Sequence, residues 1–163
     1  MFEKYTGDKI SDEDIRLILQ AGLLSPSGKG IRPWEFIVVR DKNMLERLSD
    51  SRTGAADLLR EADCAIIVIC DKSLTDVWIE DCSIAMTQMH IMADSIGLGS
   101  CWIQGRMRKA HDGRSSCEFV RDLLRYPNSF ELEAILSIGY PMDKKAPNVL
   151  SDTVSRKVHC EKY

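Results

Sequence analysis

The sequence predicts a single domain whose core mixes α-helices and β-strands, and three observations support this. First, a chain of 163 residues with 44% hydrophobic and 29% charged residues is long enough for one sizeable core. Second, segments with the apolar period of a helix alternate with short apolar runs of strand length. Third, neither repeats nor low-complexity segments interrupt this alternation. We expect the domain to span residues 1–141 and the less apolar residues 142–163 to form an extended arm.

The first half of the chain begins with a well-marked helix. Ser11 is a good N-cap, and the acidic residues at 12–14 suit the positive end of a helix dipole. Apolar side chains from Ile15 to Leu23 then form one stripe, and we expect the helix to end at Ser25-Pro26. The elements expected next are a strand at 34–40, short helices at 42–50 and 55–61, and a strand at 64–70.

The second half is dominated by a long helical pattern at 76–96. Its apolar residues lie on more than one face, which predicts a helix buried almost all round. Gly97 and Gly99 are expected to end it as C-cap glycines. A strand at 100–104, a helix capped by Ser115 or Ser116 and ending at Leu124, and a last strand at 132–140 complete the pattern.

Composition excludes several classes of function. The net charge of −3 comes from 22 basic and 25 acidic residues that are well mixed, so we expect neither a nucleic-acid nor a membrane partner. The most apolar runs have only strand length, and the N-terminus lacks the pattern of a secretory signal. The six cysteines contain no CxxC pair, and the three histidines show no ligand spacing with them. We therefore expect free thiols in a reducing, cytoplasmic setting, and no metal site.

The loop between the first helix and the first strand has the composition of a ligand-binding loop. Its prolines hold the backbone out of a helix, its glycines allow close approach to a ligand, and its serine and lysine offer a donor and a cation. These residues are Pro26, Ser27, Gly28, Lys29, Gly30 and Pro33. The alternative is a plain helix-to-strand connection that leads to a packed Trp34.

A second segment, Ile96-Gly97-Leu98-Gly99-Ser100-Cys101-Trp102-Ile103-Gln104-Gly105, follows the long helix. The two segments, in this order, resemble the nitroreductase-like family of FMN-dependent oxidoreductases. The resemblance extends from Tyr5 to the tail, through Gly139-Tyr140-Pro141 and Lys157-Val158-His159. It implies an α+β fold, with a central antiparallel or mixed sheet flanked by helices. It also implies an intertwined homodimer in which the tail embraces the partner and each of two FMN sites is built from both chains.

The resemblance also implies the residues of the site. The backbone N–H groups of Gln104 and Gly105 would face the N5 and O4 edge of the flavin, the catalytic position, although an ordinary strand-to-loop turn is the alternative for these two residues. The other implied cofactor-binding residues are Trp102 and Ile103 beside the ring, Pro26, Ser27, Gly28 and Gly30 from the partner chain, and Lys4, Arg156 and Lys157.

The chain departs from the family pattern near its start. The family carries Arg-x-Ser-x-Arg just before the position of Tyr5, where this chain opens Met1-Phe2-Glu3-Lys4. Either the sequence begins late, or other cations hold the FMN phosphate, for which Lys4, Arg156 and Lys157 are the candidates.

The function implied is transfer of reducing equivalents from NAD(P)H through FMN to a nitroaromatic, a quinone or a similar small-molecule acceptor. A flavin carries this chemistry itself, so the absence of a Ser-His-Asp or paired-carboxylate pattern fits. The alternatives are a non-catalytic flavin-binding or flavin-handling protein and a degenerate homologue that acts as an interaction module. The basic residues Arg106, Arg108 and Lys109 form either a solvated face or a landing site for the phosphates of NAD(P)H.

Overall fold

One antiparallel sheet of four strands organises the computed structural model, which describes residues 4–143 and 157–163. The strands are β1 (Trp34–Val39), β2 (Cys64–Asp71), β3 (Gly99–Gln104) and β4 (Phe130–Gly139). They lie in the order β1-β2-β4-β3, and all three pairings are antiparallel. The predicted α+β fold is therefore confirmed, and of the two predicted sheet types the antiparallel one is found.

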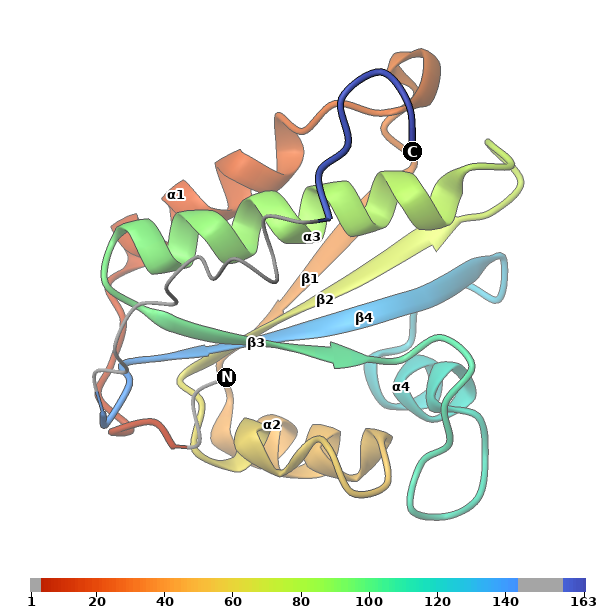
Figure 1. Cartoon of the computed structure of the whole chain (residues 1–163). Helices are drawn as coiled ribbons and strands as arrows, with labels where there is room; N and C mark the ends of the chain where they lie inside the picture. Colours follow the sequence, from red (N-terminus) through yellow and green to blue (C-terminus); the bar gives the residue numbers. More distant parts are fainter. Residues whose placement is uncertain (1–3, 144–156) are drawn as a thin grey trace.

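The helices cover both faces of this sheet. Figure 1 shows α1 (Asp12–Leu23) and α3 (Trp78–Ser95) on one face, with α2 (Lys42–Leu48) and α4 (Ser116–Leu124) on the other. Because successive side chains of a strand point to opposite faces, β2 supplies buried residues to both apolar cores and is buried along almost its whole length. The sheet is thus the middle layer of three.

Helix α3 packs across all four strands. Its side chains Ala85, Met86 and Met89 are fully buried, and α1 approaches it so closely that a Cβ on Gly22 would lie 2.8 Å from Met89. On its other side, Ile84 and Ile91 are 40% and 57% exposed. The prediction that this helix is buried almost all round is therefore wrong for the single chain, because no described element covers that side.

Two further expectations need correction. The helix expected at 55–61 is only a short 3-10 turn, Asp57–Arg60. Of the two glycines expected to cap α3, Gly97 does adopt the left-handed conformation, with φ +83°, but Gly99 is already the first residue of β3. Ser115, one of the two candidate caps of α4, is the N-cap and forms a capping box with Glu118.

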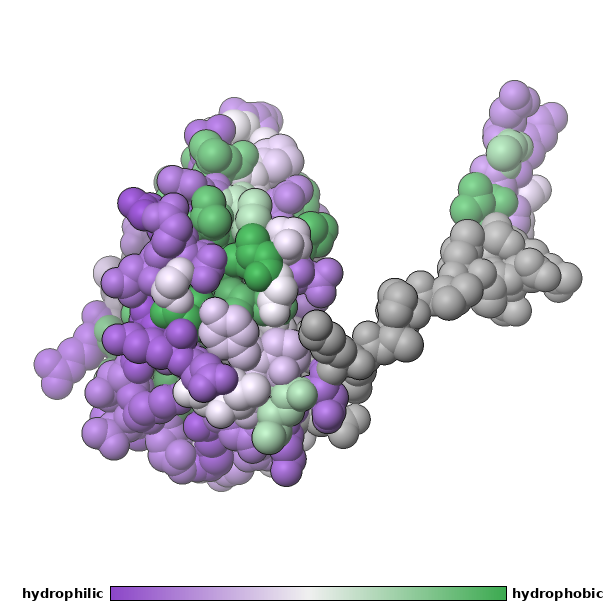
Figure 2. Space-filling model, turned by 90° about the vertical axis from the view of Figure 1, so that its left-hand side faces the viewer, coloured by the Kyte–Doolittle hydropathy of each residue, from purple (hydrophilic) through white to green (hydrophobic). Residues whose placement is uncertain are grey.

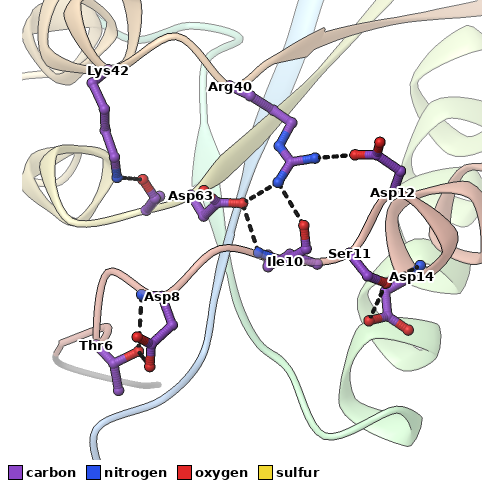
Figure 3. A network of polar contacts seen from close by, with 10 residues as sticks. Thr6, Asp8, Ile10, Ser11, Asp12, Asp14, Arg40, Lys42 and Asp63 are labelled. Atoms are coloured by element: carbon purple, nitrogen blue, oxygen red, sulfur yellow. Dashed lines mark hydrogen bonds and ion pairs between the residues drawn. The ribbon is translucent and has the colours of Figure 1, made fainter.

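A network of charged residues ties the lead-in of α1 to the sheet (Figure 3). Arg40, just after β1, donates from Nη2 to the backbone oxygen of Ile10 and to the Asp63 carboxylate, both at 2.6 Å. The same carboxylate accepts the Ile10 N–H at 3.0 Å, and Arg40 Nη1 also pairs with the exposed Asp12. These contacts hold the segment before α1 against the ends of β1 and β2.

The end of the chain is described only from Lys157 onward, and Arg156 lies outside the described residues. Residues 157–163 are all exposed, and Figure 2 shows them standing clear of the body of the molecule. The rings of His159 and Tyr163 pack on each other at 4.4 Å between centroids. The division into a domain at 1–141 and an arm at 142–163 stays a prediction.

Candidate functional site

The predicted site residues at the end of β3 share one face of the sheet. Trp102 and Gln104 are two residues apart, so both side chains lie on the α3 side, where Trp102 packs against the core. The Trp102 indole N–H donates to Gln104 Oε1 at 2.8 Å. Ile103 points to the opposite face and is buried among the residues packed under α2 and α4.

β3 ends at a bulge opposite Glu133. The backbone N–H groups of both Gly105 and Arg106 donate to the Glu133 carbonyl, at 3.1 and 2.9 Å. Gly105 is required here, because a Cβ at this position would lie 2.4 Å from Leu132 Cδ2. In the single chain the Gly105 N–H is thus already paired, whereas it was expected to face the cofactor.

The outer edge of β3 carries a row of backbone groups that pair with no strand of the described residues. Hydrogen bonds alternate along an antiparallel pair, and the Gly105 bond to Glu133 shows that the odd-numbered residues of β3 pair with β4. The N–H and C=O groups of Ser100, Trp102 and Gln104 therefore point away from β4. Within residues 4–143 and 157–163, no strand pairs with this edge. The edge offers main-chain donors and acceptors to a ligand, with Gln104 at its end.

A buried carboxylate lies beside Gln104. Glu133 is only 2% exposed, and its Oε1 accepts from Gln104 Nε2 at 3.4 Å. Its Oε2 lies 3.2 Å from Arg106 Nε. Burial raises the pKa of the Glu133 carboxyl, the Gln104 amide and Arg106 oppose this rise, and the negative charge of Glu80 adds to it.

The proline-glycine loop, defined as residues 25–33, is held by the first turn of α3. The Gly28 N–H donates to Asp81 Oδ1 at 2.7 Å, and a Cβ on Gly28 would lie 2.9 Å from Val77. Lys29 and Gly30 both have positive φ, so the chain turns tightly at this point. Pro26, Ser27, Gly28 and Gly30 are at least partly exposed.

Of the predicted phosphate cations, Lys4 lies far along the sheet from Gln104. Lys4 sits near the other end of the sheet, where its carbonyl accepts the Met142 N–H at 3.2 Å and its neighbour Tyr5 packs on Gly139. Gly139 pairs with Gly99, so Lys4 lies near the start of β3 while Gln104 lies at its end. Lys157 is exposed in the described end of the arm.

The uncovered side of α3 carries a hollow. Ser83, Ile84, Thr87 and Gln88 line a surface hollow of about 310 Å³. Figure 2 shows one face of the molecule, on which apolar side chains gather at the centre of a largely hydrophilic surface. Figures 1 and 2 together place residues 157–163 beyond the side of the molecule on which β3 lies.

Sequence reasoning missed two buried acids that organise these segments, Glu133 and Asp81. Glu133 interrupts the apolar run of β4, and Asp81 interrupts the apolar pattern of α3. An acidic residue at a core position of an element is the signal that would have pointed to them.

Other kinds of site find no support in the described residues. No group of three or more His, Cys, Asp or Glu side chains there is placed to hold a metal ion. The helices of that same part of the chain are each too short or too polar to cross a membrane. All six cysteines are free.

Comparisons with known proteins identify relatives over nearly the whole chain. A family model described as the nitroreductase family matches residues 3–53 and 48–140. The chain is similar to a solved FMN-dependent nitroreductase from Clostridium difficile R20291, with 43% identity, a TM-score of 0.94, and coverage of 99% of this chain and 94% of that one. A solved structure from Bacteroides thetaiotaomicron, provisionally named an NADH dehydrogenase/NAD(P)H nitroreductase, is 32% identical with a TM-score of 0.88 and coverage of 99% and 92%. An Archaeoglobus fulgidus protein with the same provisional name is 35% identical over 98% of this chain and 91% of its own.

Proposed function

The chain belongs to the nitroreductase family, and we propose that it is an FMN-dependent oxidoreductase that passes reducing equivalents from NAD(P)H to a nitroaromatic, a quinone or a similar small acceptor. The similarity to an FMN-dependent enzyme over 99% of the chain supports the cofactor. When bound, FMN supplies the hydride and electron chemistry, so the protein has to bind it, orient it and leave one face open.

The observation that carries this proposal is the unpaired outer edge of β3. Gln104 presents its backbone N–H there, and a main-chain donor of this kind suits the electron-rich edge of a reduced ring. We assign the donor role to Gln104 alone, because the Gly105 N–H is paired with Glu133. Trp102 would pack near the ring, whereas the Ile103 side chain is buried on the opposite face of the sheet, so we leave it out of the proposed site. Lys4, with Arg156 and Lys157, would hold the phosphate.

We propose a homodimer in which the partner completes each site. The exposed Ile84 and Ile91 of α3 are apolar positions that a second copy would cover, as permanent interfaces do. The proline-glycine loop is held by α3 of its own chain, and its exposed Pro26 and Gly30 are positions at which it could contact a neighbouring subunit. The position of residues 157–163 beyond β3 fits an arm that embraces the partner. The free cysteines favour a cytoplasmic location.

Two variants of Gln104 test the donor assignment. Gln104→Pro removes an N–H that β4 does not use, and proline is tolerated at an outward position of an edge strand. Gln104→Ala keeps that N–H and serves as the matched control. Each protein is reconstituted with FMN, and flavin reduction by NADH or NADPH is followed by stopped flow. We expect Gln104→Pro to slow reduction roughly 10²–10³-fold, as the loss of an oxyanion donor does, and Gln104→Ala to keep most of the rate.

Three results would contradict the proposal. A parent chain that neither binds FMN nor oxidises NAD(P)H excludes the enzyme. Binding without turnover favours a flavin-handling protein. A folded monomer at micromolar concentration in sedimentation excludes the shared site.

A further inference from the structure

Glu133 is a buried acid that the proposed chemistry does not use. It lies at 2% exposure in a sheet whose other interior positions are mostly apolar. Desolvation makes a buried charge expensive, and replacing a buried ion pair by apolar residues is often neutral or stabilising. Stability alone therefore gives no reason for a carboxylate at this position.

The contacts of Glu133 converge on Gln104. Gln104 Nε2 donates to the Glu133 carbonyl at 3.2 Å and to its carboxylate at 3.4 Å, while Gln104 Oε1 accepts the Trp102 indole N–H. The amide orientation is fixed from both ends, because the oxygen must face a donor and the nitrogen must face acceptors. A relay of side-chain contacts thus runs from Trp102 through Gln104 to Glu133.

Arg106 extends this relay on the other side. Its Nε lies 3.2 Å from Glu133 Oε2, yet neither atom has a hydrogen-bond partner of good geometry within the described chain, although both are buried. The charges of Arg106 and Glu133 are complementary, but no hydrogen bond fixes the two side chains to each other. The carboxylate therefore keeps an unsatisfied acceptor beside the end of β3.

We propose that Glu133 is the positioning residue of the flavin edge, and this inference rests on the proposed function. It holds the Gln104 amide by its carbonyl and its carboxylate, and the Arg106 backbone N–H by its carbonyl. Its negative charge disfavours the electron-rich reduced flavin relative to the oxidised form. Glu133 thereby lowers the redox potential of the bound cofactor and makes the reduced flavin a stronger donor to the acceptor.

Glu133→Gln, with Glu131→Gln as the matched control, tests this inference. Glu131 is a carboxylate on the same strand whose partners are Lys72 and Cys117, away from Gln104. The affinities of oxidised and reduced FMN are measured for the parent and both variants. We expect Glu133→Gln to tighten binding of reduced over oxidised FMN about tenfold, which equals a positive shift of about 30 mV for a two-electron couple. Glu131→Gln should leave the ratio of the affinities for reduced and oxidised FMN unchanged. Glu133→Asp keeps the charge and should therefore show a ratio close to that of the parent.

A second readout uses the apoprotein. The indole N–H signal of Trp102, assigned with Trp102→Phe, should shift in the nitrogen–proton NMR spectrum of Glu133→Gln but not of Glu131→Gln. A Glu133→Gln variant that binds FMN with the parent ratio overturns the inference and leaves the proposed function intact. A parent that binds no FMN overturns both, and an unmoved indole signal overturns the relay by itself.

Discussion

Replacing Arg40 by Met should remove a cation from a largely buried network while keeping much of the length of the side chain. Arg40 and Asp63 are 24% and 11% exposed at their side chains, and Arg40 also donates to the Ile10 carbonyl. The pair with Asp12 is set aside, because Asp12 is 95% exposed and such pairs contribute little.

The two remaining bonds give the magnitude. A hydrogen bond that involves a charged group contributes about 1.5–3 kcal/mol, and both bonds are 2.6 Å long. The Arg40 side chain is partly exposed to water, which reduces the summed contribution of the two bonds. We therefore expect Arg40→Met to lower the free energy of unfolding by about 3 kcal/mol. In a chain of this length that corresponds to a fall in Tm of roughly 6–12 °C.

Urea unfolding at pH 7, followed by far-UV circular dichroism, measures this loss. Asp12→Asn is the matched control and should change stability by less than about 0.5 kcal/mol. In a double-mutant cycle, Asp63→Asn should cost much less in the Arg40→Met background than in the parent. An Arg40→Met protein within about 1 kcal/mol of the parent, with an unchanged m-value, would refute this account of the network.

Three further predictions concern the site. Gly105→Ala places a Cβ 2.4 Å from Leu132, so we expect a loss of about 1–3 kcal/mol in urea unfolding, together with weaker FMN binding in a fluorescence titration. Asp81→Ala removes the acceptor of the Gly28 N–H and should raise the Kd for FMN severalfold. Asp81→Asn keeps an acceptor and should bind FMN with nearly the affinity of the parent. Equal affinities in both variants would count against a role of Asp81 in holding the proline-glycine loop. Burial raises the pKa of the Glu133 carboxyl, so the folded state favours the protonated form and loses stability as the pH rises above the unfolded pKa of about 4.3. In thermal unfolding, Glu133→Gln should therefore be at least as stable as the parent at pH 7. It should lose this advantage near pH 4.

Local signals were enough to predict most of the fold. Ser11 caps α1 and Ser115 caps α4 as their sequence contexts indicate, because caps depend on a few neighbouring residues. The strand at 64–70 was recognisable because a short run of apolar, largely β-branched residues suits a strand buried on both faces. The resemblance to a known family narrowed the sheet to an antiparallel or a mixed type, and the strand pairing in the structure decides for the antiparallel one.

What the sequence could not predict depends on pairing between distant segments. The Gly105 N–H is used by Glu133 because the register of β3 on β4 and a bulge place that carbonyl opposite it, and neither is encoded locally. The exposed side of α3 was missed for a related reason. Apolar residues on several faces show that a helix is to be covered, but not whether its own chain or a second copy covers it.

An uncovered strand edge is also a template for unwanted pairing. Natural sheets protect such edges with charged residues, prolines or covering segments, but residues 99–104 carry no charge and no proline. The same row of N–H and C=O groups that suits a ligand would equally accept an extended segment of another unfolded chain. In the proposed dimer with FMN bound, the ligand and the partner would cover this edge, and newly synthesised chains would be prone to aggregation until both are bound. The yield of folded protein in a cell should accordingly rise with the supply of riboflavin.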